Sequence, residues 1–208
     1  MIYPVSLVGF QDEVSLYMPD PTQIKSVYEN LYAADQSTPF PFWAKIWPSS
    51  IAMASFLKSE PSLIQSKRVL EIGAGIGLPS FSIESYVSEL IITDNTADAI
   101  ELIDKNIAHS SLHHAKARYL DWNSLPEDIF ADVVLLSDVN YNPAEFNSLL
   151  DIVQRFILDG ATVVIATPQR IMTNPFVDLI KPFIRRSLVI PIQEMDQVVD
   201  IGVLVLSP

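Results

Sequence analysis

The chain has 208 residues, 49% of them hydrophobic, and this length favours one domain with one substantial core over two domains. It contains no cysteine, which excludes disulfide bonds, thiolate metal sites and thiol nucleophiles and is compatible with a reducing cytoplasm. The formal net charge is −12 at pH 7, and such a surface repels phosphate backbones, so nucleic acid is disfavoured as a partner. The acidity also fits a charge that simply keeps a cytoplasmic protein soluble.

Membrane and metal-dependent classes are also disfavoured. No stretch approaches the roughly 18 unbroken apolar residues of a membrane span, and the N-terminus lacks a basic region followed by an apolar run. We therefore expect a soluble, cytoplasmic protein with no membrane partner. Histidine occurs only at His109, His113 and His114, and the adjacent pair points in different directions on most backbones, so no catalytic metal is expected.

Residues 1–40 form an N-terminal extension. Two short β-like pieces, "PVSLV" and "EVSLYM", flank the turn-like "GFQDE". Asp20 then precedes Pro21, with Gln23 three positions after Asp20, which predicts an N-cap, a proline at the first helical position and a capping-box partner. We expect a helix over residues 21–33 and a role for the extension as a lid or a substrate-recognition segment.

A proline and aromatic connection, "STPFPFWAKIWPSS", follows the extension. Pro48 predicts the start of a second helix, because proline is favoured at the first helical position. The apolar residues of this helix are Ile51, Met53, Ala54, Phe56 and Leu57.

From residue 67 onward, short apolar runs alternate with amphipathic segments. The runs are rich in β-branched residues and bounded by turn formers, as strands are: "RVLEIG", "ELIITD", "KARYL", "ADVVLLSD" and "GATVVIATP". Helix-period segments lie between most of them, which predicts an α/β, Rossmann-like doubly wound sheet that is mostly parallel. One such segment carries Ile100, Ile103 and Ile107; another, ended by Gly160, carries Phe146, Leu149, Leu150, Val153, Phe156 and Ile157.

The last two apolar runs are "SLVIPIQ" and "VVDIGVLVLSP", and only "EMDQ" separates them. This gap is too short for a crossover helix, so we expect an antiparallel hairpin that closes the sheet edge. The whole chain, residues 1–208, is predicted to be a single domain.

Three glycines, Gly73, Gly75 and Gly77, follow the first strand of this sheet. They permit a tight strand-to-helix turn and let a ligand approach the backbone. Their G-x-G-x-G spacing lacks the wider last gap of the dinucleotide fingerprint, and Pro79, where the next helix begins, has no amide hydrogen to donate. Binding of a ligand with few negative charges is therefore more natural here than phosphate binding.

Acidic side chains at the strand ends refine this interpretation. Glu71, at the tip of the strand, would repel a pyrophosphate but can accept from an ammonium. Asp94 ends the second strand at the separation where an acid meets ribose hydroxyls. Asp121 follows the third strand, where it can accept from an adenine amino group while the indole of Trp122 packs beside the ring. Together they describe a pocket for an adenosine that bears an amino acid.

This combination resembles the class I, seven-strand methyltransferases that use S-adenosylmethionine, and in particular the family-16 protein-lysine methyltransferases. The segments that carry the resemblance lie between about residue 39 and residue 170: "PFWAKIWPSSIAMASFL", "VLEIGAGIGLPSF", "IITD", "LDW" and "LLSDVNY". "IWPSS" is similar to that family's tryptophan element, which implies that the Trp47 indole borders the cofactor. "ATPQR", after the fifth strand, is only loosely like the Pro-x-Arg of some members.

"SDVNY" is similar to the family's D-x-x-Y element, with Asp138 and Tyr141 in the matching positions. The resemblance implies that Asp138 binds the acceptor ammonium and orients its nitrogen, while the Tyr141 ring, and Trp43 with less support, faces the cation. It also places Ser137, where this element begins, among the cofactor-binding residues.

Each assignment has a purely structural interpretation as well. Asp138 and Asn95 can each cap the helix that follows them. Tyr141 can be a packed core ring, Trp122 can cover a sheet edge, and Trp43 can be a packing anchor.

The leading hypothesis is therefore an S-adenosylmethionine-dependent methyltransferase that acts on a lysine of a protein. Within the same class, a small-molecule amine or another protein residue remains open as the acceptor; a shallow site favours a protein and a lid favours a small molecule. Two different functional classes also remain open: a non-catalytic binding module for a basic partner, and a nicotinamide-dependent oxidoreductase, which only the glycine loop and Asp94 support. The sequence leaves the oligomeric state open.

Overall fold

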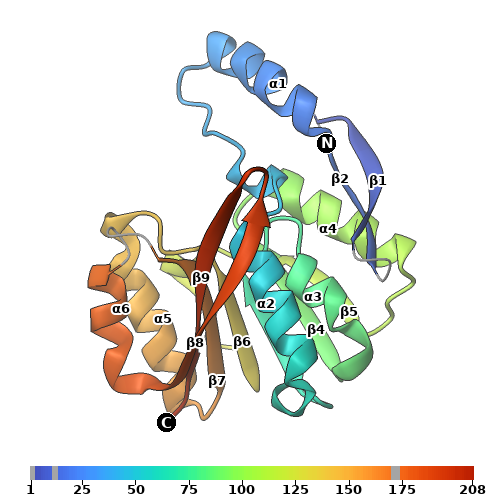
Figure 1. The fold of residues 1–208 in the computed structure, drawn as a ribbon. Coiled ribbons are helices and arrows are strands. Elements are labelled where there is room, and N and C mark those ends of the chain that lie inside the picture. The colour runs from blue at the N-terminus through green and yellow to red at the C-terminus, as the bar shows by residue number, and fades with distance from the viewer. Residues whose placement is uncertain (1–2, 11–13, 170–173) are drawn as a thin grey trace.

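The computed structural model describes residues 3–10, 14–169 and 174–208, and their main feature is one mixed sheet of seven strands (Figure 1). The strand order is β5-β4-β3-β6-β7-β9-β8, and all neighbours from β5 to β7 are parallel. These five strands are β3 (Arg68–Ile72), β4 (Glu89–Asp94), β5 (Ala115–Tyr119), β6 (Val133–Ser137) and β7 (Thr162–Pro168). The chain order reverses between β3 and β6, so the α/β, doubly wound prediction is confirmed.

The sheet ends in the predicted antiparallel hairpin. β8 (Ile184–Glu194) and β9 (Gln197–Leu206) are joined by a two-residue turn in which Met195 has a φ of 50°. β9 lies between β7 and β8 and is antiparallel to both, because the short turn leaves no room for a crossover.

Helices cover both faces of the sheet, and side chains alternate between two apolar cores. On β3, Val69 belongs to one core and the next residue, Leu70, to the other. The first core lies under α2 (Pro48–Ser59), α3 (Leu78–Ser82) and α4 (Ala97–His109), and the second under α5 (Phe146–Leu158) and α6 (Asn174–Ile180) (Figure 1). Pro48 does begin α2, and α5 does end before Gly160, which has a φ of 85°.

Short 3-10 turns complete the connections, at Phe42–Ala44, Pro61–Leu63, Glu84–Tyr86, Trp122–Ser124, Pro143–Glu145 and Lys181–Phe183. The helix after β4 begins with Thr96, not Asn95, as its N-cap, and Thr96 makes no side-chain cap bond. The interpretation of Asn95 as a cap is therefore wrong: the backbone N–H of Thr96 donates to Asp94 instead.

The N-terminal extension forms a two-stranded antiparallel sheet and a helix: β1 (Val5–Phe10), β2 (Val14–Pro19) and α1 (Pro21–Ala34). Asp20 is the N-cap of α1 and accepts from the Thr22 N–H at 2.9 Å. The capping-box prediction, in which the Gln23 side chain accepts from the Asp20 backbone N–H, is wrong. The Gln23 amide donates to the Asp20 carboxylate at 3.0 Å, because the Asp20 backbone N–H already donates to the Pro4 carbonyl.

One buried side chain attaches this extension to the body that contains the seven-stranded sheet. Asn106 of α4 accepts from the Tyr17 N–H at 2.7 Å and donates to the Tyr17 carbonyl at 3.0 Å. Lys105 lies 4.1 Å from the centroid of the Tyr17 ring and His109 packs edge-on against it. The hairpin is thereby held beside α4, and α1 stands above the body of the molecule (Figure 1).

Within the described ranges, no helix is long and apolar enough to cross a membrane, and no group of three or more His, Asp or Glu side chains is arranged to hold a metal ion. His109 and His113 are four residues apart, but α4 ends at His109. Residues 11–13 of "GFQDE" and Arg170 of "ATPQR" lie outside the described residues, so these two motifs stay predictions.

Candidate functional site

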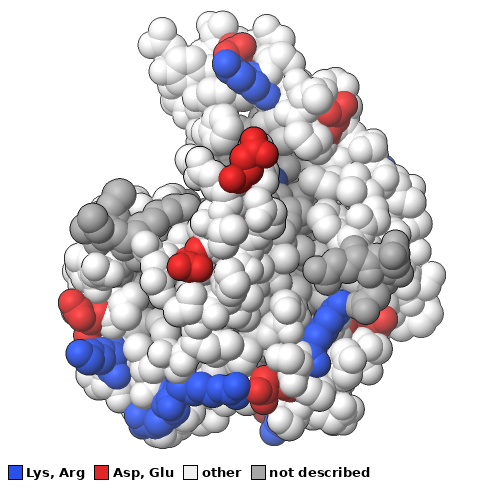
Figure 2. Space-filling model, viewed as in Figure 1, with Lys and Arg blue, Asp and Glu red and all other residues white. Residues whose placement is uncertain are grey.

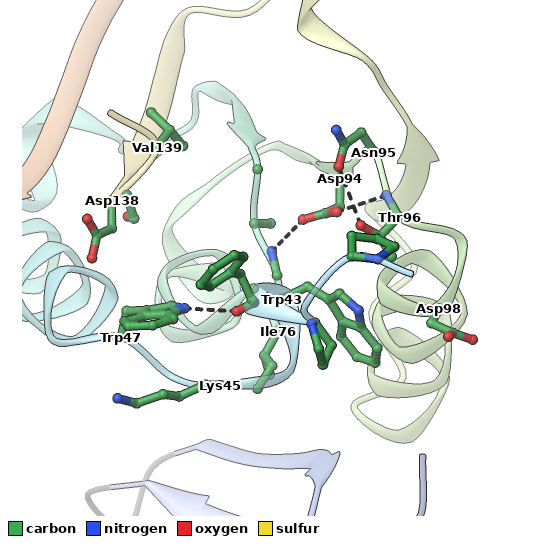
Figure 3. A pocket seen from close by; sticks show the side chains of 18 of the residues that line it. Trp43, Lys45, Trp47, Ile76, Asp94, Asn95, Thr96, Asp98, Asp138 and Val139 are labelled. Atoms are coloured by element: carbon green, nitrogen blue, oxygen red, sulfur yellow. Dashed lines mark hydrogen bonds between the residues drawn. The ribbon is translucent and has the colours of Figure 1, made fainter. Parts of the chain in front are cut away.

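A cavity of about 830 Å³ opens at the carboxyl ends of the parallel strands, where ligands of doubly wound sheets bind. Its walls come from the glycine loop after β3, the ends of β4, β5 and β6, the connection before α2, and the N-terminal extension. Figure 3 places Asp138 and Trp47 on one side of this space and Asp94, Asn95 and Thr96 on the other. The lining residues include Tyr3, Leu31, Phe40, Phe42, Trp43, Lys45, Trp47, Gly73, Gly75, Gly77, Asp94, Asp98, Trp122, Ser137, Asp138, Val139 and Tyr141.

All three predicted glycines line the cavity in left-handed backbone conformations. Their φ angles are 67° at Gly73, 57° at Gly75 and 83° at Gly77. A Cβ at Gly75 would lie 3.0 Å from the carbonyl oxygen of Trp43, so the loop and the connection approach each other at a distance that only glycine permits.

Asp94 lies at the end of β4 with its side chain in the cavity wall. One oxygen accepts from the Gly75 N–H and the other from the Thr96 N–H, both at 2.9 Å. Asp94 is only 6% exposed, and burial raises the pKa of its carboxyl, although these hydrogen bonds oppose the shift. Its carboxylate oxygens still have lone pairs for ligand hydroxyls.

Glu71 lies behind the glycine loop, and it is not among the residues that line the cavity in the described structure. Its Oε2 accepts from the Ser80 hydroxyl at 2.6 Å and from the Ser80 N–H at 3.2 Å. Burial raises the pKa of Glu71 to about 7, partly offset by Ser80. Its predicted contact with an ammonium stays a prediction, and its observed role is to connect β3 to α3.

Asp121, which is predicted to accept from adenine, is turned toward the backbone two residues further along the chain. Asp121 accepts from the Asn123 N–H at 2.9 Å as the cap of a 3-10 turn, and among the described residues it does not line the cavity. Its neighbour Trp122 does line the cavity, and the indole N–H donates to Glu145 at 3.1 Å. The adenine contact of Asp121 therefore stays a prediction that this geometry does not support, whereas Trp122 lies where a ring ligand can pack.

Trp47 borders the cavity from the N-terminus of α2. Its indole N–H donates to the Phe42 carbonyl at 2.9 Å, and the Lys45 ammonium lies 4.5 Å from its ring centroid (Figure 3). Lys45 also pairs with Glu194 at 2.8 Å. The face of Trp47 thus already contacts a cation in this structure.

Asp138 and Tyr141 lie together on the turn after β6, as the D-x-x-Y element predicts. Asp138 has a φ of 54°, and its N–H donates to the Ala166 carbonyl at 2.9 Å, so β7 holds this turn in place. The cap of the following turn is Asn142, not Asp138. Tyr141 is 48% exposed, so it is not a core ring. Asp138 therefore does not cap this turn, and Tyr141 does not pack in a core.

Around this turn, one residue has a strained backbone and two have buried polar side chains without a hydrogen-bond partner among the described residues. A left-handed conformation costs a non-glycine residue about 1–3 kcal/mol and is concentrated at functional sites. The Asn140 side-chain amide is buried, and neither of its polar atoms bonds to a described residue. Ser137 lines the cavity, and its buried hydroxyl likewise has no partner among the described residues. Because Ser137 lines the cavity, its hydroxyl indicates a ligand or water position there.

The sequence did not single out Tyr3, Phe42 or Asp98 as lining residues. Tyr3 reaches the site because its ring packs edge-on against Trp43, with centroids 5.6 Å apart. Trp43 itself is 9% exposed and anchors this packing, although it also lines the cavity. Only Phe42 had a local signal, its place in "PFPFW" beside the tryptophan element.

A comparison with known families shows which protein family has this sequence pattern. Residues 32–182 match the family described as lysine methyltransferase. The chain belongs to this family. The lysine methyltransferase family is the one the motifs predicted, and its cofactor is S-adenosylmethionine. Membership decides against the nicotinamide-dependent oxidoreductase that the generic glycine loop left open.

Similar proteins are named for different acceptor residues, arginine in one case and lysine in another. The chain is 28% identical over 111 residues to the histone-arginine methyltransferase METTL23 of Homo sapiens, covering 50% of this chain and 58% of that protein. It is 32% identical over 112 residues to the protein N-lysine methyltransferase METTL21A of Xenopus tropicalis, covering 51% of this chain and 52% of that protein. The chain thus spans little more than half the length of these relatives.

Solved structures support the fold. The N-methyltransferase NodS of Bradyrhizobium japonicum WM9, in complex with S-adenosyl-L-homocysteine, has a TM-score of 0.63 at 14% identity, over 87% of this chain and 98% of that chain. The tRNA (uracil-54, C5)-methyltransferase of Pyrococcus abyssi has a TM-score of 0.64 at 12% identity, over 97% of this chain and 44% of that chain.

The residues of this family member fit its cofactor. The cavity volume lies within the range of about 300–1,000 Å³ that is usual for small-ligand sites. Asp94 offers a carboxylate to hydroxyl groups, Ser137 offers a hydroxyl that no described residue bonds to, and Trp122 offers a ring face. The glycine loop leaves its backbone open to an amino-acid moiety. These are the residues that would hold S-adenosylmethionine.

Proposed function

We propose that this protein transfers methyl groups from S-adenosylmethionine to a lysine side chain of a protein substrate. The observation that carries this proposal is the position of Asp138 and Tyr141: both line the cavity that the glycine loop and Asp94 also line. One carboxylate and one exposed aromatic ring beside the cofactor site suit the binding of an ammonium group.

In this reaction the main task of the protein is to hold the acceptor nitrogen and the methyl group in line. When bound, S-adenosylmethionine supplies an electrophilic methyl group on a positively charged sulfur. Asp138 binds and orients the acceptor ammonium, and Tyr141 covers it with a ring face. Burial raises the pKa of the Tyr141 phenol further above its ordinary value, so this ring stays neutral at physiological pH. The amine must lose its proton before it attacks, and no residue has to act as a strong base.

The rim of the cavity favours a protein over a small amine. The extension contributes Tyr3, Leu31 and Phe40 to the walls, but α1 stands above the body and has no fully buried residue (Figure 1). Tyr141 is about half exposed. A side chain that projects from another macromolecule can reach such a site, whereas a small molecule would be better retained under a closed lid.

Arginine is a second candidate acceptor, because METTL23 is named for histone arginine. Both side chains are cationic, so the carboxylate and ring can serve either. Asp138 and the exposed cleft do not by themselves distinguish them, whereas the matched family is named for lysine.

The test is label transfer from radiolabelled S-adenosylmethionine to proteins in an extract of the source organism, followed by mass spectrometry of the labelled residue. We expect a methylated lysine in one or a few proteins, and no transfer by Asp138→Ala. Label only on arginine or only on a small amine would contradict the lysine proposal. Tight binding of S-adenosylhomocysteine without transfer to any acceptor would favour a non-catalytic binding module.

The remaining partner and location predictions are independent of this test. A cytoplasmic location and the lack of nucleic-acid and membrane partners stay predictions. Fractionation and nucleic-acid binding assays on the purified protein would check them.

A further inference from the structure

Five aromatic side chains form a continuous row from α1 to the D-x-x-Y turn, which we call the aromatic strip: Tyr32, Tyr28, Phe40, Phe42 and Tyr141. Each ring contacts the next. The centroids are 5.6 Å apart for the first pair, then 5.1 Å, 5.0 Å and 5.7 Å along the row. The strip therefore joins the outer surface of the N-terminal extension to the proposed acceptor site.

These rings do not contribute to either apolar core of the described chain. Tyr32, Phe40, Phe42 and Tyr141 are 43–50% exposed. A monomer gains little from holding large rings in water, and contiguous exposed apolar surface marks an interaction site. Tyrosine and phenylalanine are also enriched where proteins bind proteins.

The strip is continuous with the reacting end of the site. Phe40, Phe42 and Tyr141 line the same cavity as Asp138. Phe42 also lies 6.3 Å from Trp47, centroid to centroid, and holds the Trp47 indole through its carbonyl. A chain that lies along the strip therefore ends at the carboxylate that is proposed to bind the acceptor.

The charges around the strip favour a cationic partner. Among the described residues that line the cavity, Asp94, Asp98 and Asp138 are acidic, and Lys45, which pairs with Glu194, carries an ammonium. Hydrogen bonds from Ser37 lower the pKa of Asp35 at the end of α1, so this exposed carboxyl stays ionised. Figure 2 shows a cation beside an acidic group over α1, acidic groups near the tip of the β8–β9 hairpin, and most other cations toward the opposite end of this face. On α1, Lys25 pairs with Glu29 at 3.7 Å.

From these observations we infer that the aromatic strip docks an extended, basic segment of the protein substrate, with the acceptor lysine at the Asp138 end and further Lys or Arg side chains over Tyr28, Tyr32 and Phe40. The inference rests on the proposed function, whose substrate class it specifies. The negative face of an aromatic ring attracts a cation, and the surrounding carboxylates add long-range attraction. The Lys45 ammonium over Trp47 shows the same contact within this protein.

The test uses Tyr28→Ala/Tyr32→Ala, because these residues lie outside the cavity wall and alanine favours the helix. The matched control is Ser26→Ala/Asn30→Ala, two exposed polar positions of the same helix. Both variants should bind S-adenosylhomocysteine as the unmodified protein does. That measurement shows that the cofactor site has folded.

Binding is measured by fluorescence anisotropy, with S-adenosylhomocysteine present, using a fluorescein-labelled peptide of Gly and Ser that contains one central Lys and four Arg. A counterpart has Glu in place of Arg. We expect the Arg peptide to bind more tightly than the Glu peptide, and the tyrosine variant to lose about tenfold in affinity while the control keeps it. Equal affinity for both peptides, or unchanged affinity in the tyrosine variant, would overturn the inference.

Label transfer to extract proteins separates this inference from the proposed function. Transfer by the unmodified protein that survives in the tyrosine variant overturns the docking surface and leaves the methyltransferase proposal intact. Absence of transfer by the unmodified protein overturns the proposed function, and the peptide measurement still decides whether the strip binds a basic segment.

Discussion

The backbone N–H of Gly75 donates a 2.9 Å hydrogen bond to Asp94, and this bond ties the loop after β3 to the end of the neighbouring strand. The other Asp94 oxygen accepts from Thr96 at the start of α4. One buried carboxylate therefore fixes the glycine loop, the end of β4 and the beginning of a helix around the cavity. Its remaining lone pairs can accept from a hydroxyl group of a ligand, as we propose for the ribose of the cofactor.

Asp94→Asn should weaken binding of S-adenosylhomocysteine by about tenfold to a hundredfold, because a hydrogen bond to a charged group contributes about 1.5–3 kcal/mol. Calorimetry on the purified protein measures this loss. Asp121→Asn is the matched comparison, since the sequence predicts that Asp121 accepts from the adenine amino group but its side chain is turned toward Asn123. We expect the affinity of Asp121→Asn to change less than twofold. A loss as large as that of Asp94→Asn would support the predicted contact between Asp121 and adenine.

Gly75→Ala should abolish measurable cofactor binding and lower stability by about 1–3 kcal/mol. The added Cβ would lie 3.0 Å from the Trp43 carbonyl oxygen, and backbone cannot move aside as a flexible side chain does. Gly160→Ala is the control, because Gly160 also has a positive φ but has nothing within 4 Å of an added Cβ. It should lose stability by about 1 kcal/mol and keep its cofactor affinity.

Glu71→Gln should change the pH dependence of stability. Burial raises the pKa of Glu71 from 4.5 to about 7, so the folded state holds a proton that the unfolded chain releases. The stability from this group is full below pH 4.5 and is lost as the pH rises through about 7. As the pH rises from 4.5 to about 7, the free energy of unfolding of the variant should therefore increase by roughly 3 kcal/mol relative to that of the unmodified protein.

Urea unfolding at several pH values measures that difference, and the titration of other groups cancels between the two proteins. Glutamine keeps an oxygen that can accept from Ser80, so the fold around α3 should persist. Parallel stability curves for the two proteins would show that Glu71 has an ordinary pKa in the folded state.

Asp138→Asn should keep the fold and lose methyl transfer by about tenfold to a hundredfold, because asparagine tolerates the left-handed conformation but carries no charge for the acceptor ammonium. Asp138→Gly should lose transfer as well, because it removes the carboxylate, and it should keep the turn, since glycine adopts a φ of 54° without strain. Thermal unfolding and label transfer measure the two effects. Retained transfer in both variants would remove Asp138 from the acceptor site.

Asn106→Ala should release the N-terminal hairpin from α4. The substitution leaves the N–H and carbonyl of Tyr17 without their buried partner, at a cost of about 1–3 kcal/mol for each unsatisfied group. Limited proteolysis should then cut within residues 1–40 before the sheet domain unfolds. Asn123→Ala, at an exposed turn, controls for the loss of an amide, and a proteolysis pattern equal to that of the unmodified protein would refute the attachment.

The parallel sheet could be predicted because four of its five strands are short, largely apolar runs. The fifth, the edge strand β5, is partly charged, and the structure contains it as well. The hairpin could be predicted because only "EMDQ" separates its strands. The helix cap was less predictable: Asn95 and Thr96 are both good N-caps, and only the position of the Asp94 carboxylate decides which backbone N–H is already satisfied.

The motifs by themselves predicted the family and the cofactor, and they selected residues that do line one cavity: the three glycines, Asp94, Asp138 and Tyr141. Local spacing at strand ends was enough for this, because the carboxyl ends of parallel strands meet at one edge of the sheet. Only the tertiary structure decided which way the other side chains face: Glu71 turns behind the loop to Ser80, and Asp121 turns to its own backbone. It also decided that rings from α1, the connection and the β6 turn meet in one strip. Contacts between residues a hundred positions apart depend on packing, which local sequence patterns do not record.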